Sequence, residues 1–115
     1  MKAALITVLF LVLATVGSAA TSGLRGVVTR GPITPVCFAG TPCDGPAKHI
    51  AVVFWRHGGS HTATTDADGR YRISLTAGTY TVRIPTGRFG YEPQVVVVPV
   101  GRVAVRNFSI DSGIR

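Results

Sequence analysis

The segment 65–84 constrains the fold of this chain more than any other feature of its sequence. Turn signals occur at 68–69 and 77–78, where Asp-Gly and Ala-Gly dipeptides favour tight connections between strands. Apolar and polar side chains alternate over 70–75, and the alternation repeats over 79–84. Because successive side chains of a strand point to opposite faces, a period of two residues is typical of a half-buried strand. The segment therefore predicts two successive antiparallel hairpins.

Apolar runs predict further strands on both sides of this segment. Those at 50–55 and 95–98 are apolar on both faces, which is typical of buried strands. In the run 102–110 the apolar positions move from odd-numbered to even-numbered residues, so a bulge is expected at 106–107. No helical period follows residue 20. The predicted fold class is all-β, an antiparallel sandwich of about seven short strands, at 24–30, 50–55, 61–65, 70–75, 79–84, 95–98 and 102–110.

The first 20 residues carry the features of an export signal. Lys2 supplies a positive charge, an apolar run follows over 3–16, and small residues occupy 17–20. The apolar run is shorter than the roughly 20 residues that a membrane-spanning helix needs. We therefore expect residues 1–20 to be a signal peptide and residues 21–115 to be one small β-sandwich domain. The mature chain is expected to be secreted and extracellular, a monomer with no membrane anchor after cleavage.

Export also bears on the two cysteines, Cys37 and Cys43, which lie in a loop rich in proline and glycine. An oxidising compartment favours a disulfide between them. The ring would be short, so the expected gain from loop-closure entropy is only about 2 kcal/mol. The bond is therefore expected to shape one end of the domain. Five residues separate the cysteines and no helix follows, which argues against a redox-active pair.

The chain is strongly basic, with a formal net charge of +7, and arginine carries most of this charge. The arginines are spread over the predicted strands, which is typical of solvated outer faces. A second interpretation is that Arg70, Arg72 and Arg83 form one cationic face that binds an anionic polymer or a glycan. Trp55 or Tyr91 would add a stacking surface if its ring were exposed. Nucleic acid is not expected as a partner, because we expect the chain to be exported and it lacks an aromatic-rich RNA-binding signature.

No group of residues in the sequence indicates an active site. His49, His57 and His61 do not assure the three or four ligands of a zinc site. Asp66 and Asp68 fit turn chemistry better than a calcium loop, because no acidic ligand follows to close such a loop. The sequence therefore predicts a protein that is not an enzyme and that uses no cofactor and no metal.

Four segments resemble the transthyretin-like (prealbumin-like) sandwich of carboxypeptidase regulatory-like domains, in its small secreted bacterial form. These segments are 26–28, the turn at 65–71, the strand at 77–82 and the final strand at 103–110. The resemblance implies a non-catalytic accessory or binding module, and a related carbohydrate-binding-like fold uses similar sandwiches. The expected function is therefore a secreted binding module whose partner is an unknown extracellular protein or polysaccharide. The alternative is a domain that binds an extracellular carbohydrate or an anionic cell-wall polymer.

Related folds also suggest chemistry that can be compared with this chain. Hydroxyisourate hydrolases of similar architecture end in a Tyr-Arg-Gly-Ser signature, which the C-terminal residues here do not match. Intradiol dioxygenases combine tyrosines with histidines around iron, but Tyr71 and Tyr80 lack a matching histidine pattern and are expected in the core. Related pilin domains join a lysine to an asparagine by an isopeptide bond. Lys48 and Asn107, the only such residues after residue 20, are the candidates for this bond.

Overall fold

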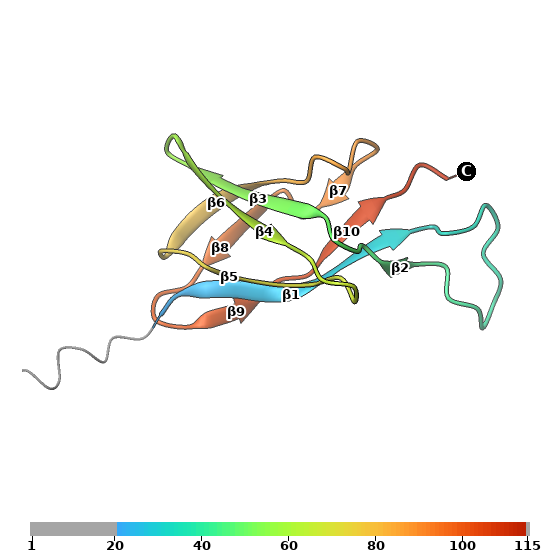
Figure 1. The fold of residues 1–115 in the computed structure, drawn as a ribbon, viewed down its shortest axis with the longest axis horizontal. Coiled ribbons are helices and arrows are strands. Elements are labelled where there is room, and N and C mark those ends of the chain that lie inside the picture. The colour runs from blue at the N-terminus through green and yellow to red at the C-terminus, as the bar shows by residue number, and fades with distance from the viewer. Residues whose placement is uncertain (1–20, 115) are drawn as a thin grey trace, which may run out of the picture.

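The computed structural model describes residues 21–114, so the expected signal peptide lies outside the described residues. The described chain forms ten β-strands and no helix (Figure 1). Residues 21–114 thus hold no helix of the length and apolar character needed to cross a membrane. The strands are β1 (Gly23–Gly31), β2 (Gly45–Pro46), β3 (Ala51–Arg56), β4 (Gly59–Thr64), β5 (Arg70–Ser74), β6 (Gly78–Arg83), β7 (Tyr91–Glu92), β8 (Val95–Val98), β9 (Val103–Val105) and β10 (Phe108–Asp111).

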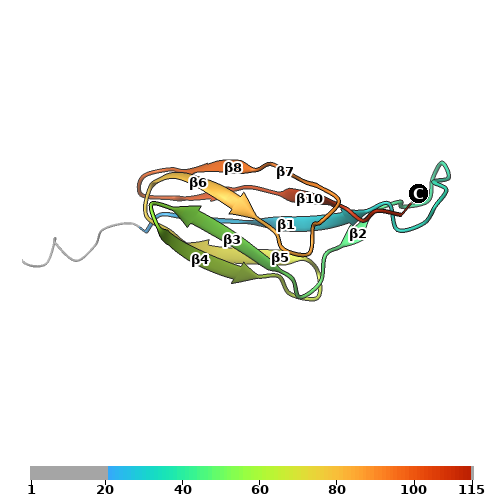
Figure 2. The ribbon, with the colours of Figure 1, turned by 90° about the horizontal axis from the view of Figure 1, so that it is seen from above.

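The strands lie in two sheets. The first sheet is built around β1, a strand of nine residues. The first half of β1 pairs with β5 and β9, and its second half pairs with β2 and β10, which in turn pairs with β7. The second sheet has the strand order β4–β3–β6–β8. The loop at 32–44 projects beyond β2 at one end of the domain, as both views show (Figures 1 and 2).

The hydrophobic core takes its side chains from both sheets. Phe54 of β3, Tyr71 of β5 and Phe108 of β10 pack against one another, with ring centroids 5.7, 6.0 and 6.1 Å apart. The Tyr71 hydroxyl donates a hydrogen bond to the carbonyl oxygen of Arg106 at 2.6 Å. Tyr80 of β6 is also buried, so the core position predicted for both tyrosines is confirmed. Aliphatic side chains fill most of the remaining core, among them Leu24, Val28, Val52, Val82, Ile84, Val96, Val98 and Ile110.

The all-β fold class and most of the predicted strands are confirmed. Six of the seven predicted segments form β1, β3, β4, β5, β6 and β8, close to their predicted bounds. The seventh segment is divided into β9 and β10, and the two-residue strands β2 and β7 were not predicted. Short pairings of this kind leave almost no periodicity in a sequence, because two residues define no alternation.

The strand partners around both turns of segment 65–84 differ from the prediction. The turn at 68–69 joins β4 of the second sheet to β5 of the first, and the connection at 75–77 leads from β5 back to β6 of the second. Neither turn forms a hairpin, so the predicted pairing was wrong although the strands were right. An alternating pattern shows that a strand buries one face. It does not show whether the next strand lies beside it or in the opposite sheet.

The sequence predicted an antiparallel arrangement, but the first sheet also contains parallel pairs. β1 runs parallel to both β9 and β10. Between β8 and β9 the chain returns to the end at which β1 starts, where the Gly23 amide donates a hydrogen bond to the Arg102 carbonyl oxygen at 3.3 Å. From that end the last strands run in the same direction as β1. The parallel pairing therefore follows from the crossover between sheets.

The prediction of a bulge at 106–107 is wrong. The residues of β1 and their partners in β9 and in β10 have the same sequence separation, so the break inserts no extra residue. Ala104 points into the core with Phe108, whereas Val103 and Val105 lie on the outer face of the sheet. The sequence suggested a shift because the inward alanine carries a weaker apolar signal than the valines that flank it.

Two strands predicted as buried on both faces have an exposed outer face. β8 lies at the edge of the second sheet, and its outward residues Val95 and Val97 are 56% and 53% exposed. β3 lies between β4 and β6, as expected for a central strand, yet Trp55 on its outer face is 51% exposed. An apolar run shows that both faces of a strand carry apolar side chains, but it does not show that both faces are covered. Among residues 21–114 no further layer covers the outer face of this sheet.

Candidate functional site

The predicted cationic face does not exist as proposed from the sequence. Arg70 and Arg72 lie on β5 in the first sheet, whereas Arg83 lies on β6 in the second sheet. All three side chains are exposed, as the alternation predicted. Because the two sheets expose opposite outer faces, Arg83 is separated from the other two by the core of the domain. The error follows directly from the hairpin that does not form.

In the first sheet, the arginine that neighbours Arg70 and Arg72 is Arg25 and not Arg83. Arg25 of β1 lies directly opposite Arg72, and Arg70 follows on the same face of β5, opposite Val27. On its other side Arg25 pairs with Val105 of β9. We call Arg25, Arg70 and Arg72 the arginine triad. Sequence reasoning missed Arg25 because it marked β1 and β5 as strands without indicating that they pair.

The arginine triad borders a shallow groove of about 410 Å³ on the outer face of β1, β5 and β9. Asp66 lies at the rim of this groove, where its carboxylate accepts hydrogen bonds from the backbone amides of Arg70 at 2.9 Å and Asp68 at 2.8 Å. These two hydrogen bonds hold the pKa of Asp66 below its ordinary value, with a smaller contribution from the charge of Arg70. Asp66 is therefore ionised near neutral pH, and its carboxylate is already hydrogen-bonded to the backbone of the turn.

Asn107 forms part of the same groove, at the break between β9 and β10. Its side-chain oxygen accepts a hydrogen bond from the Val27 amide at 2.9 Å, so the side chain takes the place of a backbone carbonyl in the ladder. Gly26, the neighbour of Val27, has no room for a side chain, because a Cβ atom there would overlap the Arg106 carbonyl and the side-chain oxygen of Asn107. The backbone of β1 and the residues at the break between β9 and β10 therefore lie close together beneath the groove.

The outer face of the second sheet is the other candidate surface. Trp55 of β3 has Ser60 of β4 on one side and Thr81 of β6 on the other. Thr81 in turn pairs with Val95 of β8, and Arg83 lies on the same face opposite Val53. We call this surface the Trp55 face, with the outward residues Val53, Trp55, Ser60, Thr62, Thr79, Thr81, Arg83, Val95 and Val97. It combines one large aromatic ring with hydroxyl groups and a guanidinium group on rigid strands.

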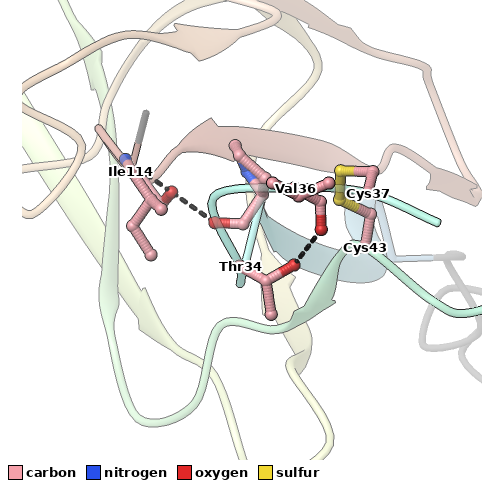
Figure 3. The surroundings of a disulfide bond; sticks show 7 residues. Thr34, Val36, Cys37, Cys43 and Ile114 are labelled. Atoms are coloured by element: carbon pink, nitrogen blue, oxygen red, sulfur yellow. Dashed lines mark hydrogen bonds between the residues drawn. A yellow bond between two sulfur atoms is a disulfide. The ribbon is translucent and has the colours of Figure 1, made fainter.

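The loop beyond β2 contains the expected disulfide. Cys37 and Cys43 are bonded, with Cα atoms 5.5 Å apart. Within the same loop the Thr34 hydroxyl donates a hydrogen bond to the Val36 carbonyl oxygen at 2.8 Å (Figure 3). Most of the loop is exposed. The bond therefore shapes an end of the domain and lies outside the hydrophobic core.

A groove of about 850 Å³ lies between this loop and strands β7 and β10. Asp44, Glu92 and Asp111 line it, which places three of the five acidic residues of the chain at one end of the first sheet. The half-buried Tyr91 also lines this groove, and its hydroxyl donates a hydrogen bond to the Val82 carbonyl oxygen at 3.0 Å. Of the two rings considered for stacking, Trp55 is therefore the more exposed.

The remaining sequence hypotheses concern the histidines and the isopeptide bond. Within residues 21–114 no group of three or more His, Cys, Asp or Glu side chains could hold a metal ion. Lys48 follows β2, which pairs with one side of β1, whereas Asn107 precedes β10, which pairs with the other side. β1 thus lies between the two residues. Both are exposed, so the structure does not bring them together in a buried site.

The chain is similar to one protein family and to one solved structure. The carboxypeptidase regulatory-like domain family matches residues 44–111. No curated protein matches the chain. Among solved structures, a DUF3823 family protein from Parabacteroides merdae is similar at 15% sequence identity with a TM-score of 0.48. The match covers 81% of this chain and 47% of that protein, so the chain spans about half the length of this solved structure.

Proposed function

This chain belongs to the carboxypeptidase regulatory-like domain family, and we propose that it is a secreted, non-catalytic module that binds an extracellular carbohydrate on the Trp55 face. Members of this family are generally non-catalytic, which is consistent with a binding role. The single observation that carries the proposal is the exposure of Trp55, 51% of whose surface is accessible in the middle of a paired strand. The Trp55 ring is exposed on a paired strand and does not contribute to the hydrophobic core, so its position is not explained by folding.

The chemistry around the ring supports a sugar as the ligand. The indole offers a flat apolar surface to the C–H face of a pyranose ring, while its N–H group is a hydrogen-bond donor. Ser60 and Thr81 lie on either side of Trp55 and supply hydroxyl groups that donate and accept. Arg83 adds a donor that matches sugar hydroxyls or carboxylates. An open sheet with one ring predicts weak binding of a single site, with a Kd of about 1 mM, equivalent to about −4 kcal/mol.

The test uses the fact that Trp55 is the only tryptophan of the chain. Its intrinsic fluorescence therefore reports on the Trp55 face alone. We would titrate the mature domain with cellohexaose, chitohexaose and laminarihexaose, and we expect at least one of them to shift or quench the emission in a saturable way. The same ligands immobilised on resin would serve for the variants that lack tryptophan.

The variants separate stacking from non-specific retention. Trp55→Ala is expected to weaken retention on the active resin at least tenfold, and Trp55→Phe to keep part of it because a smaller ring remains. Phe89→Ala is the matched control, since Phe89 is an exposed aromatic residue, 55% accessible, outside this face. If all three oligosaccharides leave the emission unchanged, or if Phe89→Ala weakens retention as much as Trp55→Ala, the Trp55 face is not a carbohydrate site.

A further inference from the structure

We propose that the arginine triad forms a second binding site, on the opposite sheet, for a short stretch of a linear extracellular polymer that carries phosphate or sulfate groups. The site is independent of the Trp55 face, because Arg25, Arg70 and Arg72 all belong to the first sheet. Failure of carbohydrate binding at Trp55 would leave this proposal intact. The shared ligand chemistry is a tetrahedral oxyanion repeated along a chain.

Two like charges of the arginine triad lie directly opposite each other. Arg25 and Arg72 are cross-strand partners in an antiparallel pair. Side chains in this position lie about 5 Å apart at Cβ, and like charges there destabilise the sheet. The other cross-strand neighbours of the triad are Val27 and Val105, so among residues 21–114 no acidic residue lies across a strand from Arg25 or Arg72. Asp66 lies beside Arg70 alone, and its carboxylate is hydrogen-bonded to the turn backbone. An arrangement that opposes folding in this way is explained by a ligand that supplies the missing negative charge.

The hydrogen-bond donors around the groove match the oxygens of a phosphate or sulfate group. A guanidinium group presents planar, paired donors that fit phosphate and sulfate oxygens in a bidentate manner. The groove of about 410 Å³ is lined by all three arginines and by Asn107, and the one carboxylate at its rim, that of Asp66, is hydrogen-bonded to the turn backbone. Because the Asn107 oxygen is bonded to the Val27 amide at 2.9 Å, its NH₂ group is left as a further donor. The donors stand on paired strands, so anion binding has to order the three arginine side chains but no loop.

The outer face of β1 limits the length of ligand that this site can hold. Along β1 the outer face passes from Arg25 to Gly31, a distance of about 20 Å. Beyond that point Asp44 and Asp111 line the other groove of the same sheet and would repel a polyanion. The outer face of β1 from Arg25 to Gly31 therefore accommodates about three anionic groups. The same acidic end disfavours a flat anionic membrane as the ligand, because a membrane would have to cover both halves of the face.

The experiment measures binding of the mature domain to fluorescein-labelled dextran sulfate and to labelled poly(glycerol phosphate), by anisotropy, over a series of salt concentrations. We expect saturable binding to at least one polymer, with log K falling against log salt at a slope of about −2 to −3, as three contacts require. Inorganic phosphate and sulfate are expected to compete only weakly. The two polymers distinguish a phosphate-bearing from a sulfate-bearing source.

Matched charge removals locate the site. The double variant Arg25→Gln/Arg72→Gln is expected to bind at least tenfold more weakly and to lose about two units of the salt slope. The control is Arg83→Gln, which removes one exposed arginine from the opposite sheet and is expected to leave both values within twofold. A second control, Arg72→Gln alone, should raise the thermal midpoint while weakening binding, which excludes misfolding as the cause.

Three outcomes would overturn the proposal. Equal weakening by Arg83→Gln and by Arg72→Gln would mean that the polymer responds only to net charge. Binding to vesicles containing phosphatidylglycerol, with none to either polymer, would identify a membrane surface. Salt-sensitive self-association in sedimentation, abolished by Arg72→Gln and restored by mixing with an Asp44→Lys chain, would assign the arginine triad to the acidic groove of a second copy.

Discussion

The side-chain oxygen of Asn107 accepts a hydrogen bond from the backbone amide of Val27 at 2.9 Å and closes the gap between β9 and β10. The Arg106 amide donates a hydrogen bond to the Arg25 carbonyl oxygen of β1 at 2.8 Å, whereas the Arg106 carbonyl oxygen accepts one from the Tyr71 hydroxyl at 2.6 Å. The Asn107 side chain thus supplies an acceptor to the ladder where the Arg106 carbonyl is bonded to Tyr71. The same contact places Asn107 beside the arginine triad.

Asn107→Ala is expected to destabilise the domain by about 1 kcal/mol, because the Val27 amide loses its partner in the ladder. For a domain of this size the thermal midpoint should fall by roughly 4–8 °C. Asn107→Asp retains an acceptor oxygen and is expected to recover most of the loss. Differential scanning calorimetry of the three proteins measures this. Equal midpoints for Asn107→Ala and the parent chain would mean that water replaces the side chain without cost.

Tyr71→Phe should cost about 1–2 kcal/mol, because the Arg106 carbonyl then loses a donor in a partly buried position. Urea denaturation at pH 7 would measure the change in the free energy of unfolding. Tyr80→Phe provides the comparison, since the Tyr80 hydroxyl is also hydrogen-bonded, to the Thr76 carbonyl oxygen at 2.8 Å. A loss confined to Tyr80→Phe would contradict the importance of the contact at the strand break.

Alkaline pH is expected to destabilise the domain through Tyr71. Burial raises the pKa of the Tyr71 hydroxyl above its ordinary value of 10.0. The folded state therefore holds the proton more tightly than the unfolded chain. Its stabilising contribution is complete below about pH 10 and declines above it by up to about 1.4 kcal/mol per pH unit.

Unfolding free energies measured from pH 8 to pH 11.5 would test this, with absorbance at 295 nm reporting tyrosinate. Tyr71→Phe should flatten the decline above pH 10, since that variant has no proton to lose at this position. An unchanged slope in the variant would assign the alkaline transition to other groups.

Acid is expected to weaken the turn at 66–69. The backbone amides of Arg70 and Asp68 hold the pKa of Asp66 below its ordinary value of 3.8. The carboxylate therefore contributes stability above about pH 4, and this contribution is lost as the pH falls through the lowered pKa. Asp66→Ala should remove the effect and destabilise the domain at pH 7, whereas Asp68→Ala in the same turn should change it less. Thermal midpoints between pH 2 and pH 7 would show whether the two variants differ.

Removal of the disulfide by Cys37→Ser/Cys43→Ser should lower stability by at most about 2 kcal/mol, because the closed ring is short and lies outside the core. The two sheets are expected to keep their circular dichroism spectrum. Limited proteolysis should show faster cleavage within 32–44 in the variant, or in the parent chain after reduction. Global unfolding of the variant at 25 °C would mean that the loop supports the fold itself.

The local structure of this chain could be predicted from its sequence with good accuracy. The alternation over 70–75 places Tyr71 inward and Arg72 outward, and both positions are found in the structure. The loop with Cys37 and Cys43 was likewise expected to be closed by a disulfide. These features depend on side-chain periodicity, turn dipeptides and spacing, which are local properties of the chain.

Only the tertiary structure decided which strands meet and therefore which side chains share a surface. The pairing of Arg25 with Arg72, and the separation of both from Arg83, follow from the crossing of the chain between sheets at 75–77. The exposure of Trp55 likewise depends on the absence of a covering layer over the second sheet among residues 21–114. A period of two residues determines the face to which a side chain points. The neighbour across that face is set by long-range packing, which leaves no period in the sequence.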